Sequence, residues 1–249
     1  MMAVPNRFLR SSDLQDQKMS ALKTAFDSYY KAWRGPSHTF GAKFPEKIVT
    51  HWSREWEYPW AVINCEPAAD MKILDCGCGG SPLLPFLTGV YHCQGFGIDM
   101  NHGDRFVPDQ ESYLKNTQFP LANLRNFFID PALIVKNITV QKGNMMNLPY
   151  HDSFFDRVLC ISVIEHMKKA DCEKAVGEMV RVLKTGGKLL ITMDHTGYNG
   201  HFIPWGDNPY LDVIRWSGLK LCGDHDFTVP DMSEIHGMYH VVGFILKKE

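Results

Sequence analysis

The residues best suited to chemistry lie in a glycine-rich turn, Asp75-Cys76-Gly77-Cys78-Gly79-Gly80, which follows an apolar run that starts at Lys72. Glycines in such a turn let the backbone bend sharply and approach a ligand with no Cβ in the way. The next apolar run ends on Asp99, 20 residues after Gly79, where a carboxylate can hydrogen-bond both hydroxyls of a ribose. The turn and the acid together predict a nucleoside-binding site.

Two residues set this turn apart from one that binds a dinucleotide. The dinucleotide pattern G-x-G-x-x-G requires a glycine where this chain has Pro82. Asp75, at the end of the apolar run, would repel a pyrophosphate and attract a ligand that carries a cationic amine. A nicotinamide-dependent oxidoreductase is therefore disfavoured. The alternative interpretation is a purely structural glycine turn in an α/β protein. The acids at positions 75 and 99 disfavour this alternative.

Three polar residues that follow apolar runs are candidates for a catalytic base. His166 comes after the run 155–162, and Asp194 and His195 come after the run 188–193. Ligands of open α/β sheets bind outside the carboxyl ends of the strands, so a base at any of these positions could face the acceptor. Each position also has a structural explanation, since His166 lies where a helix is about to begin and Asp194 could cap a turn.

These side chains require a framework of strands and helices. From Met71 onward, apolar bursts alternate with helical stretches, which is typical of repeated βα units over a mostly parallel sheet. Strands are predicted over residues 72–75, 95–99, 138–143, 155–162 and 188–193, with an antiparallel pair formed by 219–222 and 238–247 at the C-terminus. Helices are predicted over 14–31 and 171–184, and Gly186-Gly187 would close the second one.

The composition predicts a globular, cytoplasmic protein. Of the 249 residues 45% are hydrophobic, and Lys+Arg 26 against Asp+Glu 28 gives a net charge of −2, which argues against a broad basic field for nucleic acid or an anionic membrane. No apolar run reaches the ~20 residues that span a bilayer, and the start of the chain does not resemble a signal peptide. Seven cysteines, an odd number with no zinc-ligand spacing, predict neither a disulfide framework nor a metal site.

Five ordered blocks resemble a known family. Asp75, Gly77 and Gly79 match D-x-G-x-G-x-G, with Ser81 in place of the last glycine, and Asp99 matches the acid of the second strand. Residues 143–150 are similar to G-D-x-x-x-L-P-F, with Asn144 in place of the acid. Blocks similar to S-F-D-x-V…E-H and R-V-L-K-P-G-G-x-L follow at 153–166 and 181–189. Together they resemble the class I S-adenosylmethionine-dependent methyltransferases, and more closely the branch that modifies small molecules.

The resemblance implies S-adenosylmethionine as the cofactor and S-adenosylhomocysteine as its product. Asp75 and the turn would contact the methionine end, Asp99 the ribose, and the residues around Met100 and Asn144 the adenine. The full set of cofactor-binding residues implied is Asp75, Gly77, Cys78, Gly79, Asp99, Met100, Asn144, Met145 and Ser162. The family's fold class is α/β, a Rossmann-like, doubly wound, mostly parallel seven-stranded sheet with an antiparallel C-terminal strand, to which an N-terminal helical lid is added here.

The remainder of the chain is expected to cover the acceptor. Residues 1–67 would form a helical, aromatic cap packed on the core, and residues 68–249 a methyltransferase domain that is a single globular unit. Aromatic residues could line an acceptor pocket or pack in the core, and the candidates for the pocket are Tyr29, Tyr30, Trp52, Tyr198 and Trp205. The segment 53–60, S-R-E-W-E-Y-P-W, is similar to a segment of methyltransferases encoded among bacterial surface-sugar genes.

We therefore expect an enzyme that moves a methyl group from S-adenosylmethionine to a small-molecule acceptor by in-line displacement. The acceptor would be an amine, a hydroxyl or a sugar, and neither nucleic acid nor membrane is expected as a partner. An RNA or protein methyltransferase is the alternative, and it would need a basic or extended groove. A second alternative is a non-catalytic, nucleoside-binding scaffold of the same fold. The methylated atom and the oligomeric state stay open.

Overall fold

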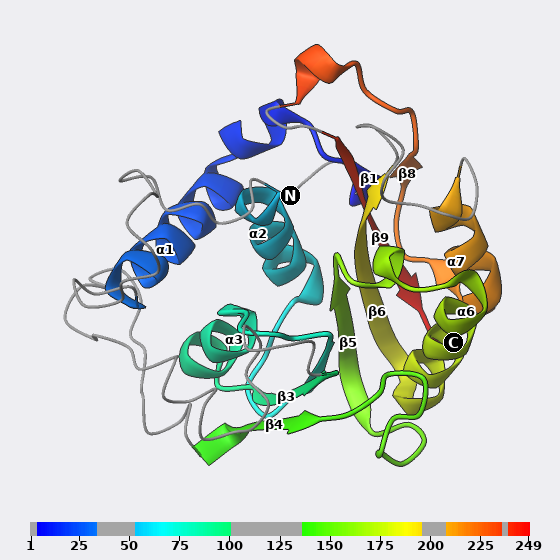
Figure 1. Cartoon of the computed structure of the whole chain (residues 1–249). Coiled ribbons are helices and arrows are strands. Elements are labelled where there is room, and N and C mark those ends of the chain that lie inside the picture. Colours follow the sequence, from blue (N-terminus) through cyan, green and yellow to red (C-terminus); the bar gives the residue numbers. More distant parts are fainter. Residues whose placement is uncertain (1–3, 34–52, 101–135, 196–207, 236–238) are drawn as a thin grey trace, which may run out of the picture.

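The computed structural model describes residues 4–33, 53–100, 136–195, 208–235 and 239–249 (Figure 1). Within these ranges one nine-stranded sheet runs in the order β4-β3-β2-β5-β6-β9-β1-β8, and β7 also pairs with β9. The strands are β1 (Asn6–Phe8), β2 (Lys72–Cys76), β3 (Gln94–Asp99), β4 (Ile138–Lys142), β5 (Phe155–Ile161), β6 (Leu183–His195), β7 (Lys220–Leu221), β8 (His225–Asp226) and β9 (His240–Lys247). The five predicted core strands are all present.

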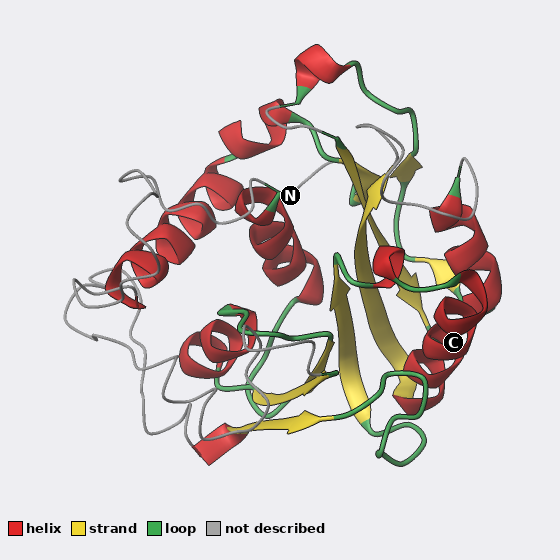
Figure 2. Cartoon of the chain, viewed as in Figure 1, coloured by secondary structure: helices red, strands yellow, loops and turns green. Residues whose placement is uncertain are grey.

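Helices cover both faces of this sheet, as Figures 1 and 2 show. The helices are α1 (Gln17–Trp33), α2 (Arg54–Cys65), α3 (Leu83–Tyr91), α6 (Lys169–Val182) and α7 (Pro209–Ser217). The first three lie on one side of the sheet, and α6 and α7 lie on the other. Strands β4, β3, β2, β5 and β6 are parallel to one another, whereas β9 is antiparallel to β6. The predicted fold class, a doubly wound and mostly parallel sheet, is confirmed.

The strand count differs from the predicted seven because the N-terminus joins the sheet. Seven strands, β4-β3-β2-β5-β6-β9-β7, form the predicted array, including the antiparallel pair of β7 and β9. The two additional strands, β1 and β8, have three and two residues. The side chain of Asn6 fixes them, because its amide donates to the backbone oxygens of Cys222 and Asp224 and accepts from the N–H of Ile245. Part of the segment 1–67 is thus a strand of the sheet itself.

The junction between α6 and β6 corrects one expectation. The helix ends at Val182 and Leu183 is already extended, with φ −76° and ψ 133°, so Gly186 and Gly187 lie inside β6 rather than after the helix. Gly186 has φ +79°, and the pairing of β5 with β6 shifts register at this place. The glycine pair therefore allows an irregularity in the strand, which its sequence position after a helix did not reveal.

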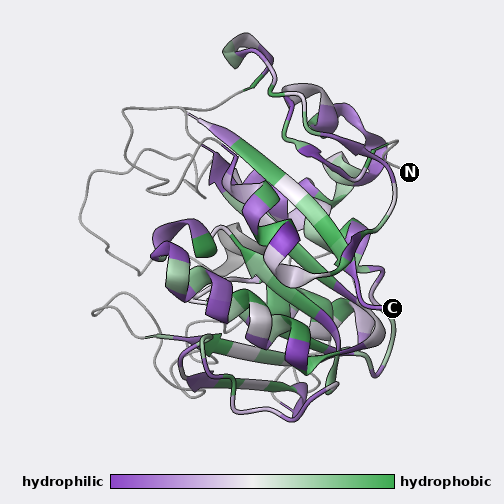
Figure 3. Cartoon of the chain, turned by 90° about the vertical axis from the view of Figure 1, so that its right-hand side faces the viewer, coloured by the Kyte–Doolittle hydropathy of each residue, from purple (hydrophilic) through white to green (hydrophobic). Residues whose placement is uncertain are grey.

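Successive core residues of each strand face opposite layers of helices. On β2, Ile73 belongs to the cluster beneath α1, α2 and α3, while Leu74 belongs to the cluster beneath α6 and α7. Figure 3 shows the resulting pattern, with hydrophobic strands behind helices whose colours alternate. On α2, Trp56 and Trp60 are fully buried with ring centres 5.5 Å apart, and both rings press on Gly243 of β9. These two tryptophans are core residues.

The described part of the chain contains no helix long and apolar enough to cross a membrane. All seven cysteines are free thiols, and six of them are buried.

Candidate active site

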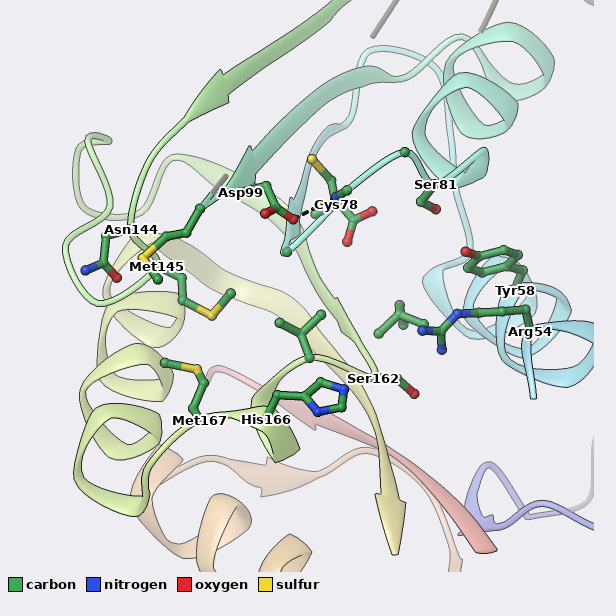
Figure 4. A pocket seen from close by; sticks show the side chains of 17 residues that line it. Arg54, Tyr58, Cys78, Ser81, Asp99, Asn144, Met145, Ser162, His166 and Met167 are labelled. Atoms are coloured by element: carbon green, nitrogen blue, oxygen red, sulfur yellow. Dashed lines mark hydrogen bonds between the residues drawn. The ribbon is translucent and has the colours of Figure 1, made fainter. Parts of the chain in front are cut away.

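A cavity of about 650 Å³ lies where β2, β3 and β5 end. All nine residues predicted to contact the cofactor line it, and they come from four separate stretches of sequence. Figure 4 shows Asn144 and Met145 at one side of the cavity, Arg54 and Tyr58 at the opposite side, and Asp99 between them. The motifs therefore follow one another along the cavity in the order predicted for a bound nucleoside. The role of each residue stays a prediction.

The glycine turn after β2 has the backbone shape that its residues predict. Gly77 and Gly79 have φ angles of +77° and +46°, in the left-handed region that favours glycine. A Cβ on Gly77 would lie 2.6 Å from the γ-carbons of Val163, so no other residue fits there without displacing the cavity wall. The N–H of Gly79 donates to a carboxylate oxygen of Asp99 at 2.8 Å, which orients the acid toward the turn.

Asp75 is the buried acid of the site, with 2% of its surface exposed. Burial and the nearby charge of Asp99 raise its pKa from 3.8 to about 7, although the charge of Arg54 acts in the opposite direction. The carboxyl is therefore protonated far more readily than an exposed aspartate. A cation placed beside it would favour its ionised form.

The far side of the cavity is formed by residues after β3 and β4. Met100 is 40% exposed, and Met145 is buried. The side-chain oxygen of Asn144 accepts from the N–H of Met146 at 2.9 Å, so the amide is held in one orientation. A thioether, an aliphatic wall and a fixed amide suit a flat heteroaromatic ring.

Helix α2 adds two residues that the sequence reasoning did not assign to the site. Arg54 and Tyr58 line the cavity, and the guanidinium carbon of Arg54 lies 5.9 Å from the centre of the Tyr58 ring. Between them in sequence, Glu57 is fully buried and accepts a hydrogen bond from Arg54. The positions 54, 57 and 58 share one face of a helix, and this spacing inside an aromatic segment is the signal that could have identified them.

The structure brings one of the three candidate bases to the cavity. His166 lines it, and burial together with the charge of Arg54 lowers the pKa of its imidazole, which is therefore neutral at pH 7. Asp194 and His195 do not line it and are 4% and 6% exposed. Asp194 lies beside Glu165, whose carboxylate accepts from the Asp194 N–H at 3.2 Å.

The two buried acids beyond the cavity influence each other. Burial and then the Asp194 carboxyl raise the pKa of Glu165 well above its ordinary value. Burial and then the charge of Glu57 raise the pKa of Asp194 to about 7. His195 is packed against aromatic rings, with its centre 5.0 Å from Phe8 and 5.9 Å from Tyr210. Its surroundings are those of a core residue.

The predicted acceptor residues are not placed by the structure. Tyr29 and Tyr30 belong to α1, in the part of that helix where side chains are not described, and Trp52, Tyr198 and Trp205 lie outside the described residues. Among the residues that are described, no three His, Cys, Asp or Glu side chains gather so as to hold a metal ion.

A doubly wound sheet with a glycine turn after one strand and an acid after the next, both facing one cavity, defines a Rossmann-like nucleoside-binding domain. Residues 74–191 match the family described as methyltransferase domain. Together with the fold, this match identifies a class I S-adenosylmethionine-dependent methyltransferase domain within the chain, and S-adenosylmethionine is the cofactor of such domains. The cavity fits that molecule, because it offers a buried acid for a cationic amine, a second acid for a ribose and a fixed amide for a base.

Known proteins with different acceptors are similar to this chain. A tRNA (carboxymethyluridine(34)-5-O)-methyltransferase of Arabidopsis thaliana is 26% identical over 193 residues, which cover 75% of this chain and 41% of that protein. Norajmaline N-methyltransferase of Rauvolfia serpentina is 41% identical over 133 residues, which cover 53% of this chain and 39% of that protein. The chain spans about half the length of the curated relatives it matches.

A solved structure shares the fold. The YcgJ protein of Bacillus subtilis superposes with a TM-score of 0.55 at 16% identity, and the match covers 78% of this chain and 98% of that one. At this level of identity the likeness concerns the fold alone.

Proposed function

We propose that this protein transfers a methyl group from S-adenosylmethionine to a small-molecule acceptor. The observation that carries the proposal is that one cavity joins the predicted nucleoside residues to His166 and to α2. The methyl group would therefore be presented in the same cavity that His166 and α2 line. A net charge of −2 supports a small acceptor, because it provides no broad basic field for RNA.

The residues that line the cavity would hold the cofactor in an extended pose. Asp75 would bind the ammonium group of the methionine end, and Asp99 would accept hydrogen bonds from the ribose hydroxyls. Met100, Asn144 and Met145 would enclose the adenine. When bound, S-adenosylmethionine supplies an electrophilic methyl group on a sulfonium, and the protein's part is to fix its position and to exclude water.

His166 would act on the acceptor. Its imidazole is neutral at pH 7 and lines the cavity, so it can take a proton from an amine or a hydroxyl as the new bond to the methyl carbon forms. The methyl carbon would leave the sulfur in the same step, and the bonding electrons would stay on the sulfur. Asp194 does not line the cavity. We propose that it acts indirectly, through the Glu165 carboxylate, which accepts a hydrogen bond from the Asp194 N–H.

Transfer to tRNA is the second candidate. The relative from Arabidopsis thaliana, which is named for activity on a tRNA uridine, matches 75% of this chain and favours it. Norajmaline N-methyltransferase, which is named for an alkaloid, favours the small-molecule proposal at higher identity over a shorter stretch.

We further propose that residues 1–67 form a helical, aromatic cap packed on the core, and that the protein is cytoplasmic. The cap proposal is supported by Arg54 and Tyr58, which line the cavity from α2. The cytoplasmic location is supported by the seven free thiols, which suit a reducing compartment.

The choice between acceptors is tested with methyl-labelled S-adenosylmethionine. The purified protein is incubated with two fractions of a cell extract, one of metabolites below the cut-off of a small-pore filter and one of total RNA. The proposal expects label in the metabolite fraction, lost when Asp99→Ala replaces the wild type. Label in the RNA fraction alone would reverse the order of the two candidates.

A further inference from the structure

Methionine side chains form part of the wall on one side of the cavity. Met100, Met145 and Met167 line it, whereas the other methionines in the described part of the chain do not. They come from three separate places, after β3, after β4 and after β5. Figure 4 shows Met145 and Met167 on the same side as Asn144 and away from Arg54. The thioethers therefore gather at the end of the cavity where the adenine is proposed to bind.

These methionines differ in how far solvent reaches them. Met100 has 40% of its surface exposed, Met167 is half-buried and Met145 is buried. Met232, on the short helix Met232–Glu234 outside the cavity, is 42% exposed. A thioether has no proton to lose, so access decides how readily a small oxidant attacks it. Met100 and Met232 should therefore react at similar rates, and faster than the other two.

The thiol in the cavity does not compete for such an oxidant. A cysteine reacts through its thiolate, which forms only when its pKa is low enough. Cys78 lines the same cavity but is 2% exposed, and burial, followed by the charge of Asp75, raises its pKa well above the ordinary value. Burial likewise raises the pKa of Cys93 and Cys172 to about 12. The reactive sulfur in this cavity is therefore a thioether.

Oxidation would make this part of the wall polar. A lone pair of the sulfur attacks one oxygen of hydrogen peroxide, the O–O bond breaks, and a sulfoxide and a water molecule are formed. The sulfur loses two electrons and the peroxide gains them. The product side chain is polar and chiral where the thioether was apolar. An adenine packed against it would bury the sulfoxide oxygen, which costs free energy unless a hydrogen-bond donor meets it.

We propose that Met100 is a site of reversible oxidation by hydrogen peroxide, and that its sulfoxide lowers the affinity of the cavity for S-adenosylmethionine and S-adenosylhomocysteine. This inference rests on the cofactor binding in the proposed function, which places the adenine against Met100. A bound ligand would shield the sulfur, so the unliganded protein is the form that reacts. A sulfoxide reductase with a dithiol reverses the change, because the oxygen leaves as water while the dithiol becomes a disulfide.

Peptide mass spectrometry after timed exposure to hydrogen peroxide measures the reaction at each methionine. In the unliganded protein, Met100 and Met232 should oxidise at rates within about threefold of each other. Met179 and Met193, which are fully buried, should react at least about tenfold more slowly. S-adenosylhomocysteine at about 100 times its dissociation constant should slow the oxidation of Met100 by tenfold or more and leave that of Met232 unchanged.

Calorimetric titration measures the effect on binding, at a dose of peroxide that converts most of Met100 and Met232. The oxidised wild type should bind S-adenosylhomocysteine about 5- to 20-fold more weakly than the untreated protein. Treatment with a methionine sulfoxide reductase and dithiothreitol should restore the affinity. In Met100→Leu, which has no thioether at this position, the same dose should leave the dissociation constant as it was before treatment. Met232→Leu is the control matched in exposure, and it should lose affinity on oxidation as the wild type does.

Three results would overturn the inference. Oxidation of Met100 at least about tenfold more slowly than Met232 would mean that the oxidant does not reach the cavity. Equal rates at Met100 with and without S-adenosylhomocysteine would mean that the ligand does not cover this sulfur. An equal loss of affinity in oxidised Met100→Leu and oxidised wild type would place the sensitive residue elsewhere. If the untreated wild type bound no S-adenosylhomocysteine, the proposed function would fail and the inference with it, whereas each of these three results overturns the inference alone.

Discussion

Replacing Asp75 by asparagine should stabilise the unliganded protein at alkaline pH while removing its affinity for the cofactor. The pKa of Asp75 is about 7 in the folded protein and 3.8 as the ordinary value. The folded protein therefore binds this proton more tightly than the unfolded chain does. The free energy of unfolding should fall as the pH rises from 3.8 to about 7 and stay lowered above that.

The magnitude follows from the two pKa values. Their difference corresponds to about 4 kcal/mol of destabilisation at pH 8 and above. Asparagine has nearly the same shape but cannot ionise, so the variant does not undergo this pH-dependent destabilisation. Burial of the amide has its own free-energy cost, which does not depend on pH. Between pH 5 and pH 8.5 the advantage of Asp75→Asn over the wild type should therefore grow by about 3 kcal/mol.

Urea unfolding at the two pH values measures this growth. Asp224→Asn, at an exposed aspartate, is the matched control and should show no comparable change. Addition of S-adenosylhomocysteine at 100 times its dissociation constant should stabilise the wild type by about 2.7 kcal/mol and Asp75→Asn much less. A variant whose advantage does not grow with pH, or one that binds the ligand as the wild type does, would refute the reasoning.

Three further predictions concern the same site and the core behind it. The affinity for S-adenosylhomocysteine should rise about tenfold between pH 6 and pH 8, because Asp75, with a pKa of about 7, must lose its proton to receive the ammonium. The affinity for 5′-methylthioadenosine, which has no ammonium group, should not change with pH. Calorimetric titrations in which both affinities depend on pH in the same way would contradict this prediction. Gly77→Ala should lower the free energy of unfolding by about 1–3 kcal/mol and weaken ligand binding more than tenfold. The reason is that Gly77 has a φ of +77° and that a Cβ there would lie 2.6 Å from Val163. A variant that unfolds in urea as the wild type does would argue against this prediction. Gly243→Ala should lower the free energy of unfolding by about 1–3 kcal/mol, because its Cβ would lie 2.9 Å from the rings of Trp56 and Trp60. The affinity for the ligand should stay within about twofold of the wild type. A loss of affinity without a loss of stability would instead place these tryptophans in the site.

The strands that position the site could be predicted because their determinants are local. The apolar run of β2 and the turn after it are adjacent in sequence, and β3 ends on Asp99 as the ribose pattern requires. The helix α6 was predicted to within a few residues at both ends. Short-range periodicity and the conformational demands of glycine were sufficient for these elements.

Features that depend on distant contacts could not be predicted in this way. Strand β1 exists because Asn6 bonds to backbone more than 200 residues away, which no local pattern reveals. Arg54 reaches the cavity because Glu57 meets Ser162 and Thr192, 105 and 135 residues further along the chain. The glycines at 186 and 187 were interpreted as a helix stop, since the irregularity they allow in β6 is visible only from its pairing with β5.

The central claim is that the cavity at the ends of β2 and β3 binds a sulfur nucleoside. Calorimetric titration of the wild type and of Asp99→Ala with S-adenosylhomocysteine and with NAD tests it most directly. We predict micromolar binding of S-adenosylhomocysteine by the wild type, at least about tenfold weaker binding by the variant, which loses the ribose acceptor and the partner of the Gly79 N–H, and no binding of NAD. Binding of NAD in place of S-adenosylhomocysteine, or equal affinity in the wild type and the variant, would contradict the claim.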